Sequence, residues 1–184
     1  MTSRSGWLDA GLAVLSTDGW GALTIDVLSE RVGRSKGSFY HFFGGVPGYR
    51  TALMEHFEQL RTQTFIDQLA AMPADDGVRT LRRMTEIVGA DAERTRDLEV
   101  AIRSWAGRDE QVREALERID AARIEFLQSQ CRRVVADPQV ADDVGTMIYM
   151  LMIGANHLLP TPTANDQVRM WNQLVTFLEA AAPD

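Results

Sequence analysis

Hydrogen-bonding side chains crowd one short stretch of this 184-residue chain, between positions 34 and 41. They are Arg34, Ser35, Lys36, Ser38, Tyr40 and His41. The set offers cations, hydroxyl groups and an imidazole, and Gly37 among them would let a backbone approach a partner closely. This inventory suits the binding of a polar partner through charge and hydrogen bonds.

The residues around this stretch predict two short helices joined by a tight turn. Thr24 is an N-cap residue by type, because its hydroxyl can accept from a free backbone N–H. Gly33 stands where a helix end needs a positive φ, and Ser35 can cap the second helix. Helical spacing gives the pair an apolar inner face of Ile25, Leu28, Val32, Phe39, Phe42 and Phe43. A helix, a glycine turn and a helix are typical of a helix-turn-helix.

The run TIDVLSERVGRSKGSFYHFF resembles the DNA-binding segment of the tetracycline-repressor (TetR) family. The shared features are an LTID-like helix start, a G-R-S turn and the KGSFYHFF helix. The resemblance covers the N-terminal quarter and is only a pattern beyond it. It implies an all-helical homodimer that binds operator DNA with its N-terminal domain and releases it when a small molecule enters the C-terminal domain. The alternative is a helical hairpin with no nucleic-acid role.

The resemblance assigns DNA contacts to Thr24, Arg34, Ser35, Lys36, Ser38, Tyr40 and His41. Thr24 and the free amides of its helix would meet a phosphate. The start of the second helix would reach base edges in the major groove, where Arg34 and Lys36 suit guanine. Ser38 would contact a base, and Tyr40 and His41 the DNA backbone.

The chain departs from the family before the fourth helix, where Val46 replaces a common lysine that reaches a phosphate. Arg50, one turn on, would compensate, or DNA binding would be weaker. Val46 itself would either tuck under the turn beside Pro47 or point to solvent.

Composition and charge are ordinary for a soluble globular protein, with 45% hydrophobic and 24% charged residues. The net charge is −7, but residues 1–50 carry five basic and four acidic side chains, so the acidity lies in the remainder. A locally basic head on an acidic body is compatible with DNA binding. No apolar run approaches the roughly 18 residues of a membrane helix, and no signal peptide is evident. The single cysteine, Cys131, fits a reducing cytosol, so we expect a cytoplasmic protein without intrachain disulfides.

The rest of the chain predicts helices only, so the expected fold class is all-α. A first helix over 5–18 would complete a three-helix DNA-binding head. Further helices are expected over 47–72, 77–89, 97–106, about 110–136, 139–159 and about 164–181, with 91–96 either a short helix or a loop. We place the helix-turn-helix domain at 1–46 and a ligand-binding and dimerisation body at 47–184.

Two functional surfaces are expected in the body. A cavity for an apolar or aromatic ligand would be lined by Phe65, Met84, Trp105, Met147, Tyr149 and Met150. A homodimer interface would use Ile148, Leu151, Ala155, Trp171, Leu174 and Leu178. Taken singly, each cavity residue is better explained as ordinary core, and Cys131 as a small buried hydrophobe.

These features predict a homodimeric transcriptional repressor that binds double-stranded operator DNA and is released by a small effector. The alternative from another class is a helical small-molecule-binding or interaction protein without DNA binding. An enzyme ranks third, because no Ser-His-Asp set, metal-ligand cluster or glycine-rich phosphate loop appears. We therefore expect no catalytic residue, no cofactor and no metal site.

Overall fold

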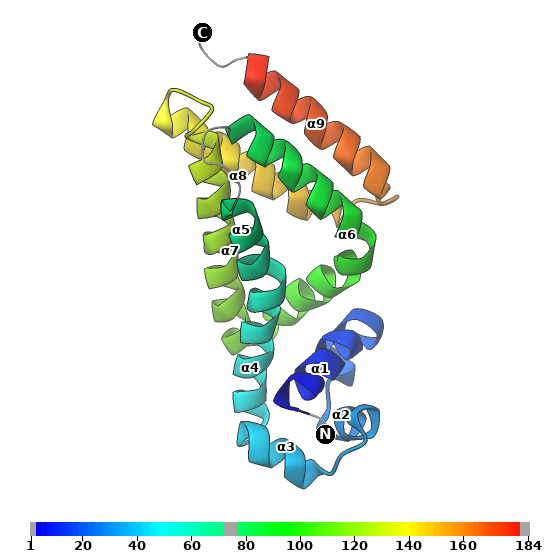
Figure 1. The fold of residues 1–184 in the computed structure, drawn as a ribbon. Helices are drawn as coiled ribbons and strands as arrows, with labels where there is room; N and C mark the ends of the chain where they lie inside the picture. The colour runs from blue at the N-terminus through cyan, green and yellow to red at the C-terminus, as the bar shows by residue number, and fades with distance from the viewer. Residues whose placement is uncertain (1–2, 72–76, 181–184) are drawn as a thin grey trace. The chain divides into compact units, whose positions relative to one another are not determined.

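The computed structural model describes residues 3–71 and 77–180, with the side chains of 89–94 left aside (Figure 1). Within these ranges the regular structure is helical and contains no strand, which confirms the all-α prediction. The elements are α1 (Arg4–Asp18), η1 (Trp20–Ala22), α2 (Ile25–Val32), α3 (Lys36–Phe43), α4 (Val46–Glu58), η2 (Gln59–Gln63), α5 (Thr64–Ala70), α6 (Gly77–Ala106), α7 (Glu110–Cys131), α8 (Pro138–Ala155) and α9 (Ala164–Ala180).

The chain forms two compact units, and neither is a single stretch of sequence. The first unit comprises the described residues up to Arg61 together with Thr95–Ile119. The second comprises the described residues of Thr62–Arg94 and those from Asp120 onward. The helical run α4–η2–α5, helix α6 and helix α7 each pass from one unit into the other. The sequence-based division after residue 46 stays a prediction.

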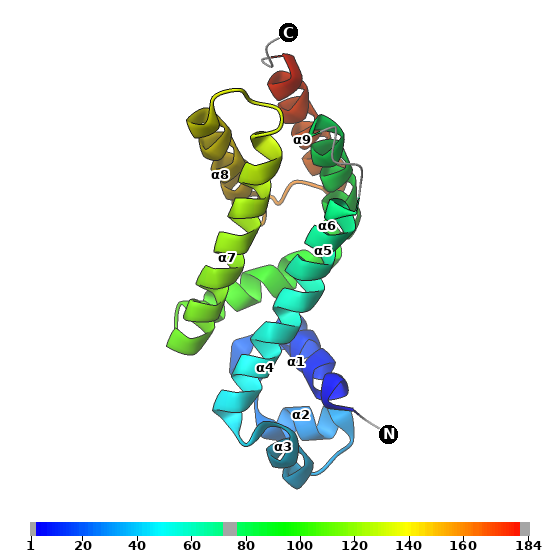
Figure 2. The ribbon, with the colours of Figure 1, turned by 60° about the vertical axis from the view of Figure 1, so that its left-hand side comes forward.

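In the first unit, α1 and α3 lie beside α4 (Figures 1 and 2). The core of this unit is built on aromatic side chains from these three helices. The Phe39 ring packs 5.6 Å from that of Trp7 and 5.0 Å from that of Tyr49, centroid to centroid. The Tyr49 hydroxyl donates to the Trp7 carbonyl oxygen at 2.9 Å inside this core. Gly11 makes room for it, because a Cβ there would lie 2.0 Å from the Tyr49 hydroxyl. Helix α3 is thereby fixed to α1 and α4 through its inner face.

The second unit has a separate core between the first part of α6 and helices α5, α7, α8 and α9. Its buried apolar side chains are Leu69, Leu81, Met84, Leu127, Cys131, Ala141, Ile148, Tyr149 and Val175. Helix α9 contributes only Val175 to the fully buried set, fewer than α6, α7 or α8, while its half-buried Trp171, Leu174 and Leu178 pack against the core.

Helix boundaries differ from the sequence-based expectations at several places. One continuous helix, α6, spans 77–106, so the polar segment 91–96 is helical. Helix α7 ends at Cys131 rather than near 136, and α8 ends at Ala155 rather than 159. A π-helical segment, η2, interrupts the fourth helix. The expected end of that helix at Met72 and the loop over 73–76 lie outside the described residues.

Candidate nucleic-acid interface and ligand pocket

The turn between α2 and α3 has the capped geometry that its sequence predicts. The Thr24 hydroxyl accepts from the Val27 amide at 3.3 Å, and the Ser35 hydroxyl accepts from the Ser38 amide at 3.4 Å. Gly33 adopts φ 68°, the left-handed conformation in which a side chain would be strained. Both helices therefore begin at defined residues, and the first amides of α3 point out of its N-terminus.

Helix α3 presents one face to its core and the other to solvent. Phe39 and Phe43 are buried, which confirms their predicted core positions. Of the predicted DNA-binding residues, Ser38 is half-buried and the others are exposed: Thr24, Arg34, Ser35, Lys36, Tyr40 and His41. The Tyr40 side chain is 52% exposed although it is aromatic, and its ring meets the buried Phe39 ring edge-on at 5.8 Å between centroids. The structure thus gathers six polar side chains on and beside the start of one rigid helix.

One acidic residue shares this surface and was missed by sequence reasoning. The Asp26 carboxylate, in the first turn of α2, forms an ion pair with the Lys36 ammonium. This hydrogen bond raises the pKa of Lys36. Both side chains are well exposed, so the pair is free to exchange for other partners. An acid at the start of α2 was visible in the sequence, but its meeting with Lys36 depends on the turn geometry.

The start of α4 continues this surface beyond the glycine turn. Val46 is its first residue and is 39% exposed. Arg50 pairs with the Asp109 carboxylate at 3.1 Å, while the other oxygen of Asp109 caps α7 by accepting from the Val112 amide at 3.2 Å. Arg50 is therefore already engaged by Asp109 within the first unit.

The predicted ligand-cavity residues do not all meet. Met84 and Tyr149 are buried in the second unit's core, and Phe65 packs against it. Trp105 instead belongs to the core of the first unit. Met147 and Met150 lie on the solvent side of α8, 56% and 60% exposed.

Tyr149 takes part in a polar cluster of the second unit rather than in a cavity wall. Its hydroxyl donates to the Asp120 carboxylate at 2.6 Å, and burial raises the pKa of Tyr149 to about 12. The Arg123 guanidinium donates to the buried Thr62 hydroxyl at 2.8 Å, inside the π-helical segment. The cluster ties η2 to α7 and α8 through paired groups.

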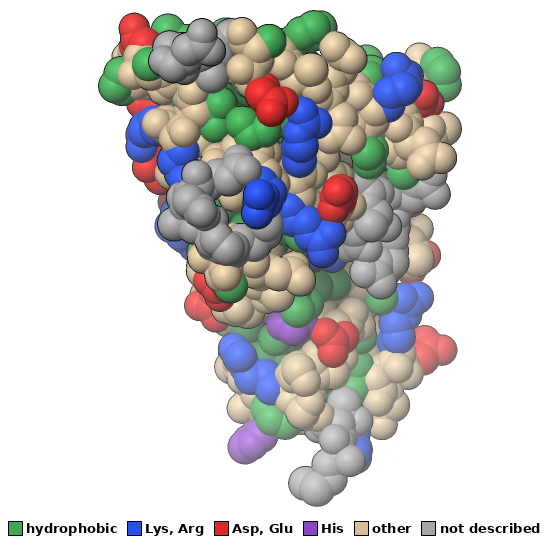
Figure 3. Space-filling view, turned by 45° about the horizontal axis from the view of Figure 1, so that its top comes forward, with side chains coloured by type: hydrophobic (Ala, Val, Ile, Leu, Met, Phe, Trp, Pro, Cys, Tyr) green, Lys and Arg blue, Asp and Glu red, His purple; other side chains and the backbone are tan. Residues whose placement is uncertain are grey.

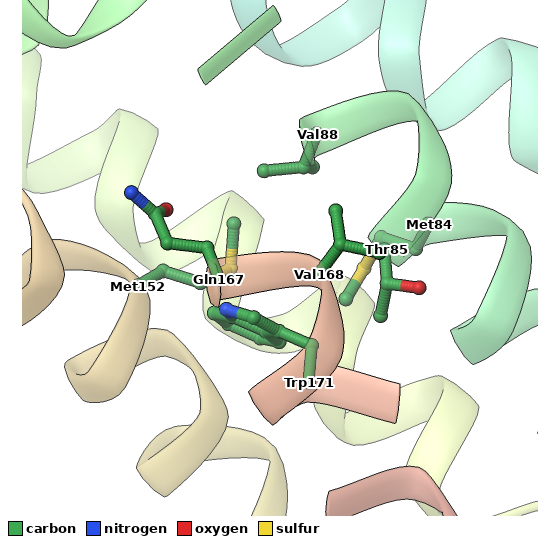
Figure 4. A pocket seen from close by; sticks show the side chains of 7 residues that line it. All are labelled: Met84, Thr85, Val88, Met152, Gln167, Val168 and Trp171. Carbon is green, nitrogen blue, oxygen red and sulfur yellow. The ribbon is translucent and has the colours of Figure 1, made fainter. Parts of the chain in front are cut away.

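A small pocket lies in the second unit between α6, α8 and α9 (Figure 4). Side chains from the three helices converge on it: Met84, Thr85, Val88, Met152, Gln167, Val168 and Trp171. Met84 was predicted as a ligand residue and Trp171 as a dimer residue, and the structure places both in this wall. Its free volume is about 10 Å³, enough for about one water molecule.

The predicted dimer residues divide between the interior and the surface of the second unit. Ile148 is 2% exposed and packs inside its own chain. Leu151 is well exposed, and Ala155, Trp171, Leu174 and Leu178 are half-buried. Further large apolar side chains stand exposed beside them on α8 and α9: Met147, Met150, Met170 and Phe177.

The described residues contain neither a candidate metal site nor a candidate membrane-spanning helix. No group of three or more His, Cys, Asp or Glu side chains there is arranged to hold a metal ion. No helix there is long and apolar enough to cross a membrane. On the face drawn in Figure 3, acidic and basic side chains are interspersed rather than separated into large areas of one sign.

Residues 8–45 match the profile of the family described as "Bacterial regulatory proteins, tetR family". The head of this chain is therefore similar to that of TetR-family proteins. The match covers α1, α2, α3 and the turn that precedes α4, the elements that carry the exposed polar face. The structure has the arrangement expected from this similarity, an N-terminal helix-turn-helix head and a helical C-terminal body.

Solved structures share this fold over nearly the whole chain. A putative TetR-family transcriptional regulator from Rhodococcus sp. has a TM-score of 0.79 at 17% identity, covering 96% of this chain and 98% of the other. A TetR transcription regulator from Haloarcula marismortui has a TM-score of 0.75 at 16% identity, covering 97% of each chain. Reduced NemR from E. coli has a TM-score of 0.73 at 17% identity, covering 98% of this chain and 99% of the other. No curated protein matches the sequence.

Proposed function

We propose that this TetR-family regulator is a homodimeric repressor that binds double-stranded operator DNA and leaves it when a small apolar or aromatic effector binds its body. The observation that carries the proposal is the exposed polar face of α3, held by a buried aromatic inner face and by two capped helix starts. Such a helix enters a major groove with its N-terminal residues toward the bases. Regulation, rather than catalysis, is the activity these features support.

The polar side chains around α3 fall into two groups, those suited to phosphates and those suited to base edges. The α2 N-terminus with Thr24, and the Tyr40 hydroxyl, are suited to phosphates, which fix the register of the protein on the duplex. Arg34 at the turn, with Lys36 and Ser38 on the first turn of α3, is suited to base edges. Since Lys36 is paired with Asp26 in the free protein, DNA must compete with that carboxylate for the ammonium group.

The dimer would form through the exposed apolar side chains of α8 and α9. Leu151 on α8 and Phe177 on α9 are 58% and 62% exposed, and each lies on a helix with further exposed methionines. An apolar area of this kind marks an interface between chains. A two-fold axis there would pair each helix with its copy and present two recognition helices to two half-sites.

The test is a gel-shift titration of the full chain with DNA that flanks its own gene, beside random DNA of equal length. We expect preferential binding of one flanking segment, and weaker binding for Lys36→Ala and Tyr40→Phe. Lys36→Ala removes a cation and should flatten the log–log salt dependence by up to about one charge, whereas Tyr40→Phe removes a neutral hydroxyl and should leave the slope nearly unchanged. Glu55→Ala, an exposed change on α4, is the matched control. Absence of DNA binding by a folded, dimeric wild-type protein would favour a binding protein that has no nucleic-acid role.

A further inference from the structure

The pocket of the second unit is walled by side chains that carry no charge. Two thioethers, two valines and the indole of Trp171 form most of its surface, with one hydroxyl and one amide (Figure 4). Both polar groups are already hydrogen-bonded outside the pocket. The Thr85 hydroxyl donates to the Arg82 carbonyl oxygen at 2.7 Å, and the Gln167 amide nitrogen donates to the Pro162 carbonyl oxygen at 3.1 Å.

This wall discriminates by charge. An ionised group placed against it would lose its hydration and find no opposite charge, which is strongly unfavourable. A flat neutral ring would instead stack on the indole and meet the polarisable sulfurs of Met84 and Met152. The lining therefore favours neutral aromatic molecules over their ionised analogues.

The pocket must widen to admit such a ring, because its present volume suits about one water molecule. Helix α9 is the wall that can move. Only Val175 of this helix is fully buried. Among the described residues, its polar ties to α6 include the exposed Arg82–Glu179 ion pair, a 3.4 Å hydrogen bond from Arg82 to the Thr176 hydroxyl, and the contact between the Thr85 hydroxyl and the Asn172 side-chain oxygen at 3.1 Å. An exposed ion pair contributes little stability, so parting α9 from α6 is the low-cost way to open the pocket.

We infer that the effector of this protein is a neutral aromatic molecule that binds between α6, α8 and α9, against Trp171, and opens the pocket by displacing α9. The inference rests on the proposed function, since it names the site and the chemical class of the effector. The same helix carries Met170 and Phe177 on its exposed side. A ligand bound between α9 and helices α6 and α8 would therefore displace the surface proposed to contact the second subunit.

The test compares indole with indole-3-carboxylate, which share a ring system and differ in charge. Each is titrated into the full-length protein carrying ¹³C-methyl methionine, with signals assigned by Met→Leu variants. We expect indole to shift the Met84 and Met152 methyl signals in a saturable way, because a bound ring perturbs nearby methyl groups. Met54 in the core of the first unit is the internal control, and its methyl signal should not shift.

Two further comparisons sharpen the result. Indole-3-carboxylate should bind roughly tenfold more weakly or worse. Val168→Phe, which fills the pocket, should abolish the shifts, whereas Val140→Phe on the exposed side of α8 should leave them. Equal affinity for both probes, absence of a saturable shift at Met84 and Met152, or shifts at Met54 of the same size would overturn the inference. DNA binding is measured without either probe, so its failure would count against the proposed function alone.

Discussion

Replacing Val46 by lysine tests how the head docks on DNA. Val46 is the first residue of α4, 39% exposed, directly after a turn in which Gly44 and Gly45 have positive φ. Its side chain has no hydrogen-bonding group, and Arg50, the nearest cation of α4, is held by Asp109. A lysine here would therefore add one new phosphate contact per subunit if this turn faces the backbone.

The size of the effect follows from counterion release. Two added contacts per dimer steepen the log–log salt dependence by about 1.8, since each contributes about 0.9 on double-stranded DNA. Over a fourfold rise in salt, the advantage of the variant should shrink about 12-fold. The cost in stability is small, because a cation in the first turn of an exposed helix opposes the helix dipole by about 0.3–1 kcal/mol.

The assay is a gel-shift or anisotropy salt series on operator and random DNA, with melting temperatures measured in parallel. Val46→Gln is the matched control, because it adds length and polarity without charge. A phosphate contact carries no sequence information, so both DNAs should gain alike. A gain confined to the operator, or an unchanged slope in a variant that melts normally, would show that this turn does not face the backbone.

Three other perturbations have defined outcomes. Asp26→Asn removes the carboxylate that competes for Lys36, so binding to operator and random DNA should both tighten and the salt slope should rise; an unchanged slope in the same titration would count against this role. Phe177→Glu should dissociate the dimer in light scattering, whereas the neighbouring exposed Gln173→Glu should not; a dimeric Phe177→Glu variant would mean that the interface lies elsewhere. Burial raises the pKa of Cys131 to about 11 from 9.0, so at pH 8 its disulfide-exchange labelling should be about 100-fold slower in the native protein than in urea. Equal labelling rates would show that this thiol is accessible.

Local signals were enough to predict the head. Thr24, Gly33 and Ser35 each form a cap hydrogen bond with a backbone group within four residues, so their capping roles can be predicted from the local sequence. The burial of Phe39 and Phe43 followed from helical spacing. The pairing of Lys36 with Asp26 did not, because it depends on how α2 and α3 cross.

In the body, the sequence was ambiguous for a physical reason. Helix α8 is apolar on more than one side, so spacing alone could not tell that Ile148 faces the core and Met147 faces solvent. Trp105 and Trp171 were similarly indistinguishable by type, yet one lies in the first unit's core and the other in the pocket wall of the second. The engagement of Arg50 by Asp109 joins residues far apart in sequence, which no local pattern records.

The segments that build the first unit determine how its head could be transferred to another protein. Its core joins Phe57 of α4 to Ile102 and Trp105 from the end of α6 and Val112 from the start of α7. A segment cut after the recognition helix, or even after Arg61, would leave that core without its later partners. A functional transplant of this head onto another body must therefore carry Thr95–Ile119 with it, as a two-piece exchange. A single crossover after Arg61 between unlike relatives would therefore separate this core from its later partners.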